Sequence, residues 1–432
     1  MECNMTNPGK SMYDLAGRLF PICRSITGQG VRDTFAILKE YCPEIELFEV
    51  ETGTKVFDWT VPNEWRIDEA YIENSKGDRI IDFKENNLHV LGYSTPIDSI
   101  VNLSELKEHI YTLKDQPEVI PYVTSYYKER WGFAMTDNMK NSLPEDDYHV
   151  VIKSELFKGS LTYGELIIPG QTDEEIFLST YICHPSMANN ECSGPSLMVH
   201  LADYIKKLKN RRYTYRIVFV PETIGAITYL SKNLNSMKGK VIAGFNLTCV
   251  GDDRTYSIVH SRYANTLADR VLSTVLKYHY PKYCDYSYLK RGSDERQYQA
   301  PGVDLPLVCF CRSKYHVYPE YHTSADNMEL ISPQGLQGSL DVMVQCIDAL
   351  EMNNYYCVTC LCEPQLGKRG LVPTMSSKET YLETLAMKDV LAYADGSNDL
   401  IELAQIIEQP ISVVVKVVGQ LLEADLLKVM KR

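Results

Sequence analysis

Residues 174–195, EEIFLSTYICHPSMANNECSGP, begin as an apolar strand-like run and continue through Cys183-His184-Pro185 into the start of a helix. A short apolar run bounded by turn residues is typical of a strand that is covered on both faces. Similar runs follow at 213–220 (YTYRIVFV), 241–250 (VIAGFNLTCV) and 305–311 (LPLVCFC). Helix-like runs lie between and after them, at 195–209, 226–238, 264–279 and 334–352. This alternation predicts an α/β domain on a mostly parallel mixed sheet with helices on both faces.

The flanking sequence predicts two further units. The first ~40 residues read as two helices, and a strand-like run at 45–51 joins them to the α/β domain. Residues 55–150 contain short β-like runs, such as 56–61 and 87–93, between Pro, Asn, Asp and Gly. We therefore expect an α/β domain formed by 1–54 and 151–375, interrupted by a β-rich insertion at 55–150. Residues 376–432, with three helical runs and a strand-like end, are typical of a winged helix-turn-helix.

Polar side chains follow several of the predicted strands. His184 follows the first, Glu191 opens the next helix, Glu222 follows the second strand, and His322 lies in the loop before the last helix. In such sheets the ligand site lies beyond the carboxyl ends of the strands, where these side chains converge. Two imidazoles and two carboxylates form a zinc-type ligand set. Each residue alone has a structural explanation, as a hydrogen-bonded His or a helix N-terminal carboxylate, but the set favours a metal site.

Composition narrows the class of protein. The 432 residues include 44 Lys and Arg against 57 Asp and Glu, a net charge of −13, which argues against a general affinity for nucleic acid or anionic lipid. The 13 cysteines are odd in number and scattered, as expected for reduced thiols in the cytoplasm. No stretch has the roughly 20 apolar residues of a membrane span. The tail at 376–432 has 6 basic and 9 acidic residues, so it lacks the basic stripe of a DNA-binding module.

These motifs resemble known proteins in two ways, one broad and one more specific. The order HPSMANNECSGP, VFVPETIG, FNLTCVGDD and EYHTSADN is similar to that of the co-catalytic zinc aminopeptidases. Together with RGSDERQY and CEPQLGKRGL, it more closely resembles a family of uncharacterised bacterial proteins associated with surface-polysaccharide biosynthesis. The resemblance covers nearly the whole chain. It implies an aminopeptidase-like domain, a small inserted domain and a C-terminal winged helix.

Departures from the peptidase pattern change the expected metal site. The positions of two carboxylate ligands are occupied by Asn190 and Asn246, and the usual pair of glutamates is reduced to Glu222. A neutral amide is a poor zinc ligand, so a second ion would lack neutralising charge. We therefore expect one zinc ion held by His184, Glu191 and His322. The resemblance leaves Asn190, Asn246 and Asp326 as additional or second-layer candidates, with Asp326 orienting the loop of His322.

The roles of the remaining charged residues stay open at this stage. Glu222 is predicted as the general base, with a role as a further ligand as the alternative. Asp294 or Glu320 could hold the α-amine of a peptide, or could serve structural hydrogen bonds. Arg296, next to Asp294, could bind an anionic sugar or a carboxylate, with simple ion pairing as the alternative.

The leading hypothesis is a zinc-dependent hydrolase of amide bonds in a peptide or an amide-bearing sugar. Its rival is a catalytically inactive, aminopeptidase-like binding or scaffold protein, supported by Asn190 and Asn246. A DNA-binding regulator is disfavoured by charge. The apolar helical run at 411–425 favours a protein partner or self-association through the winged helix, with no nucleic acid and no membrane as partner.

Overall fold

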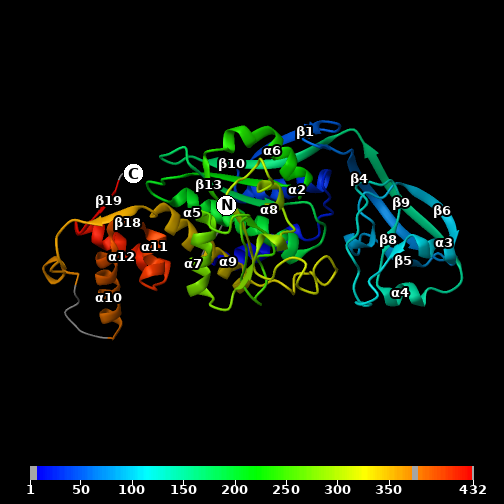
Figure 1. The fold of residues 1–432 in the computed structure, drawn as a ribbon. Helices are drawn as coiled ribbons and strands as arrows, with labels where there is room; N and C mark the ends of the chain where they lie inside the picture. Colours follow the sequence, from blue (N-terminus) through cyan, green and yellow to red (C-terminus); the bar gives the residue numbers. More distant parts are fainter. Residues whose placement is uncertain (1–6, 372–377, 431–432) are drawn as a thin grey trace.

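A computed structural model describes residues 7–371 and 378–430, and it contains three units along one axis (Figure 1). The central unit is built on an eight-stranded sheet of order β1-β10-β12-β11-β13-β16-β14-β15. Strands β11, β12, β13 and β16 are parallel neighbours, while β1 and β10 add an antiparallel edge. The strands are β1 (Glu46–Glu51), β10 (Ser160–Ile168), β11 (Glu175–Tyr181), β12 (Thr214–Val220), β13 (Val241–Leu247), β14 (Ser257–Val259), β15 (Cys284–Tyr286) and β16 (Leu307–Cys311).

Alternating side chains on the central strands pack into two separate cores. On β11, Ile176 and Leu178 pack into one apolar cluster and Phe177 into the other, so both faces of the sheet are buried. The first face is covered by α1 (Pro8–Leu19), α2 (Gln29–Tyr41), α5 (Ser193–Lys207), α7 (Leu267–His279) and α9 (Pro333–Glu351). The second face carries α6 (Ile224–Met237) and α8 (Glu295–Tyr298). The predicted mixed sheet with helices on both faces is confirmed.

The inserted unit lies at one end of the molecule (Figure 1). Its antiparallel sheet has the order β5-β4-β9-β6. Its elements are β2 (Lys55–Val56), β3 (Trp59–Thr60), β4 (Glu64–Glu73), β5 (Arg79–Asp82), β6 (Ile97–Asn102), α3 (Leu103–Glu108), β7 (Ile110–Tyr111), β8 (Phe133–Ala134), α4 (Asp137–Ser142) and β9 (Asp147–Phe157). The strand expected at 87–93 is wrong: Asn87–His89 form a 3₁₀ turn, capped by the side chain of Asn86.

The C-terminal unit lies at the opposite end of the molecule (Figure 1). It contains β17 (Tyr355–Val358), α10 (Lys378–Tyr393), β18 (Asp395–Asp399), α11 (Leu400–Ile406), α12 (Ile411–Glu423) and β19 (Leu427–Val429). Its three-stranded sheet takes its central strand, β17, from residues upstream of the predicted boundary at 376. The apolar groups of α12 pack inward, with Val414, Val418 and Leu421 fully buried. Packing of these three side chains accounts for part of the apolar run, while Val413, Val415 and Leu422 are only partly buried.

Within the described ranges, no helix has both the length and the apolar character required to cross a membrane.

Gly194 fixes how closely α5 approaches the sheet. A Cβ at this position would lie 2.2 Å from Oγ1 of Thr180 and 2.9 Å from the carbonyl oxygen of Leu247, two atoms already hydrogen-bonded to each other. We expect Gly194→Ala to lower the free energy of unfolding by about 1–3 kcal/mol through overpacking. Gly419→Ala, in α12 with open space around it, should raise stability by about 0.5–1 kcal/mol. Urea titration of both variants checks the pair, and equal effects would contradict this packing.

Candidate metal centre

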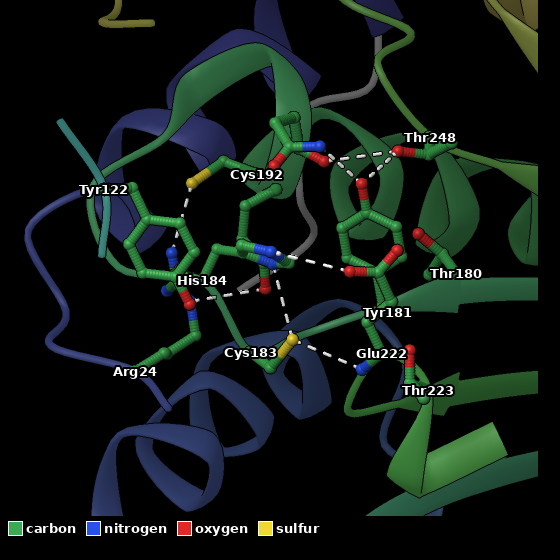
Figure 2. Close-up of polar contacts among 12 residues, drawn as sticks. Arg24, Tyr122, Thr180, Tyr181, Cys183, His184, Cys192, Glu222, Thr223 and Thr248 are labelled. Carbon is green, nitrogen blue, oxygen red and sulfur yellow. Dashed lines mark hydrogen bonds and ion pairs between the residues drawn. The ribbon is translucent and has the colours of Figure 1, made fainter. Parts of the chain in front are cut away.

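Two predicted site residues, His184 and Glu222, lie close together at the carboxyl ends of neighbouring central strands (Figure 2). His184 lies three residues beyond β11, and Glu222 two residues beyond β12, the strand paired with it in parallel. Glu191 lies in the single helical turn that leads into α5. The parallel register places these side chains at one edge because both strands end there.

His184 has different neighbours at its two ring nitrogens. Nδ1 lies 2.9 Å from Oε2 of Glu191 and 3.4 Å from Sγ of Cys183. Nε2 faces the other way, 3.6 Å from Oε2 of Glu222. The ring is almost fully buried. A carboxylate on Nδ1 fixes the orientation of the ring and leaves Nε2 available to a metal ion.

Glu191 is held by a buried cation that the sequence did not reveal. Nε of Arg24 lies 3.5 Å from Oε1 of Glu191, and both side chains are 1% exposed. Arg24 also donates to the carbonyl oxygens of His184 and Leu19, at 2.9 and 2.7 Å. Glu191 was predicted as a metal ligand, but here its charge is shared between Arg24 and His184. The contacts favour a positioning role for Glu191.

His322 approaches from the loop before α9. Its ring centroid lies 5.2 Å from that of His184, and it stacks on Tyr321 at 3.9 Å. Tyr122, from the inserted unit, packs against both histidine rings at 5.1 Å, and its backbone N–H donates to the carbonyl oxygen of His322 at 2.8 Å. The inserted unit therefore contributes one wall of the site.

The three second-layer candidates have distinct surroundings. The carboxylate of Asp326 accepts the backbone N–H groups of Asn189 and Asn190, at 2.6 and 3.0 Å, and so ties the His322 loop to the turn of Glu191. Burial raises the pKa of Asp326 to about 6, although these hydrogen bonds oppose the shift. The side chain of Asn190 donates to the hydroxyl of Tyr181. Asn246 donates to Ser293 and Glu295, on the side of the sheet toward α8.

The predicted substrate-binding residues separate into two places. Asp294 and Arg296 both hold Thr223, the residue after Glu222: Oδ1 of Asp294 accepts its N–H at 2.7 Å, and Arg296 donates to its hydroxyl. Thr223 has a φ of +65°, so this turn is strained and needs such support. Glu320 instead forms a two-point ion pair with Arg254 on the surface, at 2.8 and 2.6 Å. That pairing occupies the Glu320 carboxylate.

Buried polar atoms without a partner are concentrated at this site. Among the described residues, twelve buried side-chain nitrogen or oxygen atoms have no hydrogen-bond partner. Six belong to predicted site residues: Asn190 Oδ1, Glu191 Oε1, Asn246 Oδ1, Asp294 Oδ2, Arg296 Nε and His322 Nε2. Leaving such atoms unpaired costs free energy, so a cluster of them is typical of a site for a ligand or an ion.

Burial shifts the pKa values of the ionisable groups at this site. Burial raises the pKa of Glu222, against the attraction of His184 and Arg296. Burial and the nearby charge of Glu222 raise the pKa of Asp294 well above its usual range. Burial, with the repulsion of His184, lowers the pKa of His322 well below its usual range. This shift favours the neutral imidazole of His322, the form that binds metal ions.

Two positions for an ion can be compared at His184. Among the described residues, one group of three candidate ligands has all its ligand atoms within 4.8 Å of one another: Cys183, His184 and Glu191. On that side Arg24 already balances Glu191, and burial raises the pKa of the Cys183 thiol to about 11, so the thiol is neutral. On the other side, Nε2 of His184 faces the Glu222 carboxylate, and the neighbouring ring of His322 has a buried Nε2 without a partner. Imidazole and carboxylate are donor types that zinc accepts.

Sequence reasoning did not find Arg24 or Tyr122. Arg24 carries no periodic or motif signal, since its partners are 160 and 167 residues away in the chain. Tyr122 lies in the insertion, far from every quoted motif. Only the folded chain brings these two residues to the histidines.

Comparisons with known proteins agree with this architecture. The family described as a domain of unknown function (DUF4910) matches residues 13–353, and a winged helix-turn-helix family matches 353–429. A relative from Clostridium acetobutylicum, provisionally named as a polysaccharide biosynthesis protein with aminopeptidase-like domain, is 45% identical over 403 residues, covering 93% of this chain and 92% of the relative.

Solved structures extend the comparison to the fold. A crystal structure from Clostridium acetobutylicum, provisionally named as a peptidase, is 43% identical with a TM-score of 0.91, covering 98% of this chain and 96% of the other. BSAP, a zinc aminopeptidase from Bacillus subtilis, is 12% identical with a TM-score of 0.56, covering 77% of this chain and 93% of the other. This last likeness shows the fold alone. The chain belongs to the DUF4910 family, as a member with an aminopeptidase-like domain and a C-terminal winged helix.

Proposed function

We propose that the protein is a hydrolase of amide bonds that binds one zinc ion at His184, Glu222 and His322. The observation that carries the proposal is that Nε2 of His184 faces the Glu222 carboxylate, beside the ring of His322, whose buried Nε2 has no hydrogen-bond partner. Two histidines and one glutamate form a known type of catalytic zinc site that leaves a position open. Asn190 and Asn246, without charge, support one ion rather than two.

This arrangement revises two predicted roles. Glu191, predicted as a ligand, supports His184 through Nδ1 and is itself supported by Arg24. Glu222, predicted as the base, takes its alternative role as a ligand because its carboxylate lies beside Nε2 of His184. The ion, when bound, polarises an amide carbonyl and lowers the pKa of a water molecule. Asp294 can hold the transferred proton at Oδ2, which is buried and has no partner.

The local structure supports these separate roles of Glu222 and Asp294. Asp294 is anchored at Oδ1 by the N–H of Thr223, so its position relative to Glu222 is fixed by one backbone bond. Burial and the charge of Glu222 raise the pKa of Asp294 well above its usual range, which makes its carboxylate a stronger base than an ordinary Asp. Tyr122 and Tyr321 flank His322 and exclude water from that side.

Two isosteric substitutions separate ligand from proton carrier. We expect Glu222→Gln to lose zinc and hydrolysis together, and Asp294→Asn to keep zinc while kcat falls by about 10²–10⁴. Elemental mass spectrometry and release of a chromophore from aminoacyl anilides measure the two properties. Zinc retained in Glu222→Gln with activity lost would instead make Glu222 the base. Zinc bound by the native protein without turnover on peptides and acetylated amino sugars would favour the scaffold.

A further inference from the structure

Arg296 is a cation that acts on Glu222 of the proposed metal site through space, without a direct ion pair among the described residues. Its guanidinium donates a hydrogen bond to the hydroxyl of Thr223. Its Nε is buried and has no partner. An arginine carries five N–H donors in a fixed fork that matches a carboxylate. A buried, unpaired guanidinium N–H is costly unless a ligand completes it.

The surroundings of Arg296 place it where two units meet. Its charge acts on Glu222 and Tyr321 of the aminopeptidase-like domain and on Tyr127 of the inserted unit. Tyr127 is 76% exposed, and its ring contacts Trp59 edge to face at 5.7 Å. Arg296 therefore lies within electrostatic range both of the proposed metal site and of an accessible aromatic side chain of the inserted unit.

A purely structural role accounts for only part of this arrangement. The bond to Thr223 supports a strained turn, and Asp294 already holds the N–H of that residue at 2.7 Å. A neutral donor would serve the hydroxyl of Thr223 equally well, so that hydrogen bond does not itself require the positive charge of Arg296. Glu222 and Asp294 act on Arg296 only through space, and their negative field disfavours a doubly charged ligand such as phosphate.

We propose that Arg296 binds a carboxylate of the substrate next to the amide bond that is cut. The inference rests on the proposed function and narrows it: the substrate is a small molecule that carries both an amide and a free carboxylate. An N-acyl amino acid or dipeptide satisfies this description, and so does an amide-bearing sugar acid. In the first case the carboxylate is the C-terminus, and in the second it belongs to the ring.

Equilibrium binding to the full-length, zinc-loaded protein tests this without requiring turnover. The probes are N-acetylglycine, N-acetylglycinamide and N-acetylgalactosaminuronic acid, measured by calorimetry with the native protein, Arg296→Gln and Arg291→Gln. Arg291 is an exposed arginine of the same segment whose guanidinium bonds only to the carbonyl of Tyr288. We expect Arg296→Gln to weaken binding of an acid about 10- to 100-fold, with amide binding and the Arg291→Gln variant unchanged.

The ratio of the affinity for the acid to the affinity for the amide separates the effect of the Arg296 charge from its hydrogen bond to Thr223. Distortion of the Thr223 turn would weaken binding of both probes alike. Preference for one acid over the other identifies the peptide or the sugar source. If the native protein binds the acids through Arg296 but does not hydrolyse Leu-Gly, the proposed hydrolase function is contradicted and the carboxylate-binding site is supported. An unchanged ratio in Arg296→Gln, or no binding of either acid by the native protein, would overturn the inference.

Discussion

Replacing His322 by Asn is expected to remove bound zinc and to reduce amide hydrolysis by at least about a thousandfold, because the ion loses one of its two imidazole ligands. The matched control is His316→Asn, six residues upstream. The two histidines have φ of +58° and +61°, and Asn is among the side chains that best tolerate this backbone region. The two substitutions therefore impose a similar backbone strain. They differ in that His322 is a proposed zinc ligand and His316 is not. Zinc content and aminoacyl anilide turnover measure the effect.

Cys183→Ser tests the competing position of the ion, on the Nδ1 side of His184. In the proposed arrangement Cys183 binds no metal: its sulfur accepts the backbone N–H of Glu222 at 3.2 Å. A serine hydroxyl can accept the same bond, so this variant should keep its zinc. Zinc lost in Cys183→Ser but retained in His322→Asn would move the ion to the group of Cys183, His184 and Glu191.

Arg24→Met is expected to cost about 3–5 kcal/mol of the free energy of unfolding of the aminopeptidase-like domain. The substitution keeps an apolar side chain of similar length but leaves Glu191 buried without its cation. It also removes the donors to two backbone carbonyls, at Leu19 and His184. Urea unfolding followed by tryptophan fluorescence and limited proteolysis measures the loss.

Two comparisons make the Arg24 result specific. Arg18→Met removes an exposed arginine from the preceding helix, where the guanidinium pairs with Glu40 on the surface at 2.8 Å, and should cost less than about 1 kcal/mol. Adding Glu191→Gln to Arg24→Met removes the uncompensated charge and should recover part of the stability. Equal losses in the two arginine variants would show that the buried pair has no special role.

Much of the fold follows from local pattern. The apolar runs that end at Cys183 and Val220 predicted β11 and β12 because both faces of a parallel sheet are covered, which leaves few polar positions within a strand. The 87–93 run failed for the opposite reason. Asn86 caps the next N–H groups with its own side chain, and such local bonds compete with strand pairing.

The site was accessible from the sequence only in part. Strand ends located His184 and Glu222, because the rule for parallel sheets converts chain order into a place in space. For Glu320 the sequence left open an amine-binding role and a structural one, and in the structure its carboxylate pairs with Arg254 on the surface. The orientation of the Glu191 carboxylate depends on Arg24, which lies 167 residues away in the sequence. No local pattern encodes such a pair, so ligand and supporting residue could not be distinguished.

The zinc content of the native protein is the most direct test of the account. Untagged protein, supplied with zinc and then freed of loosely bound metal by gel filtration, is analysed by elemental mass spectrometry per chain. The account predicts one zinc ion per chain, lost in His322→Asn and kept in His316→Asn. No retained zinc would contradict the metal site, and two ions per chain would show that Asn190 and Asn246 support a second ion after all.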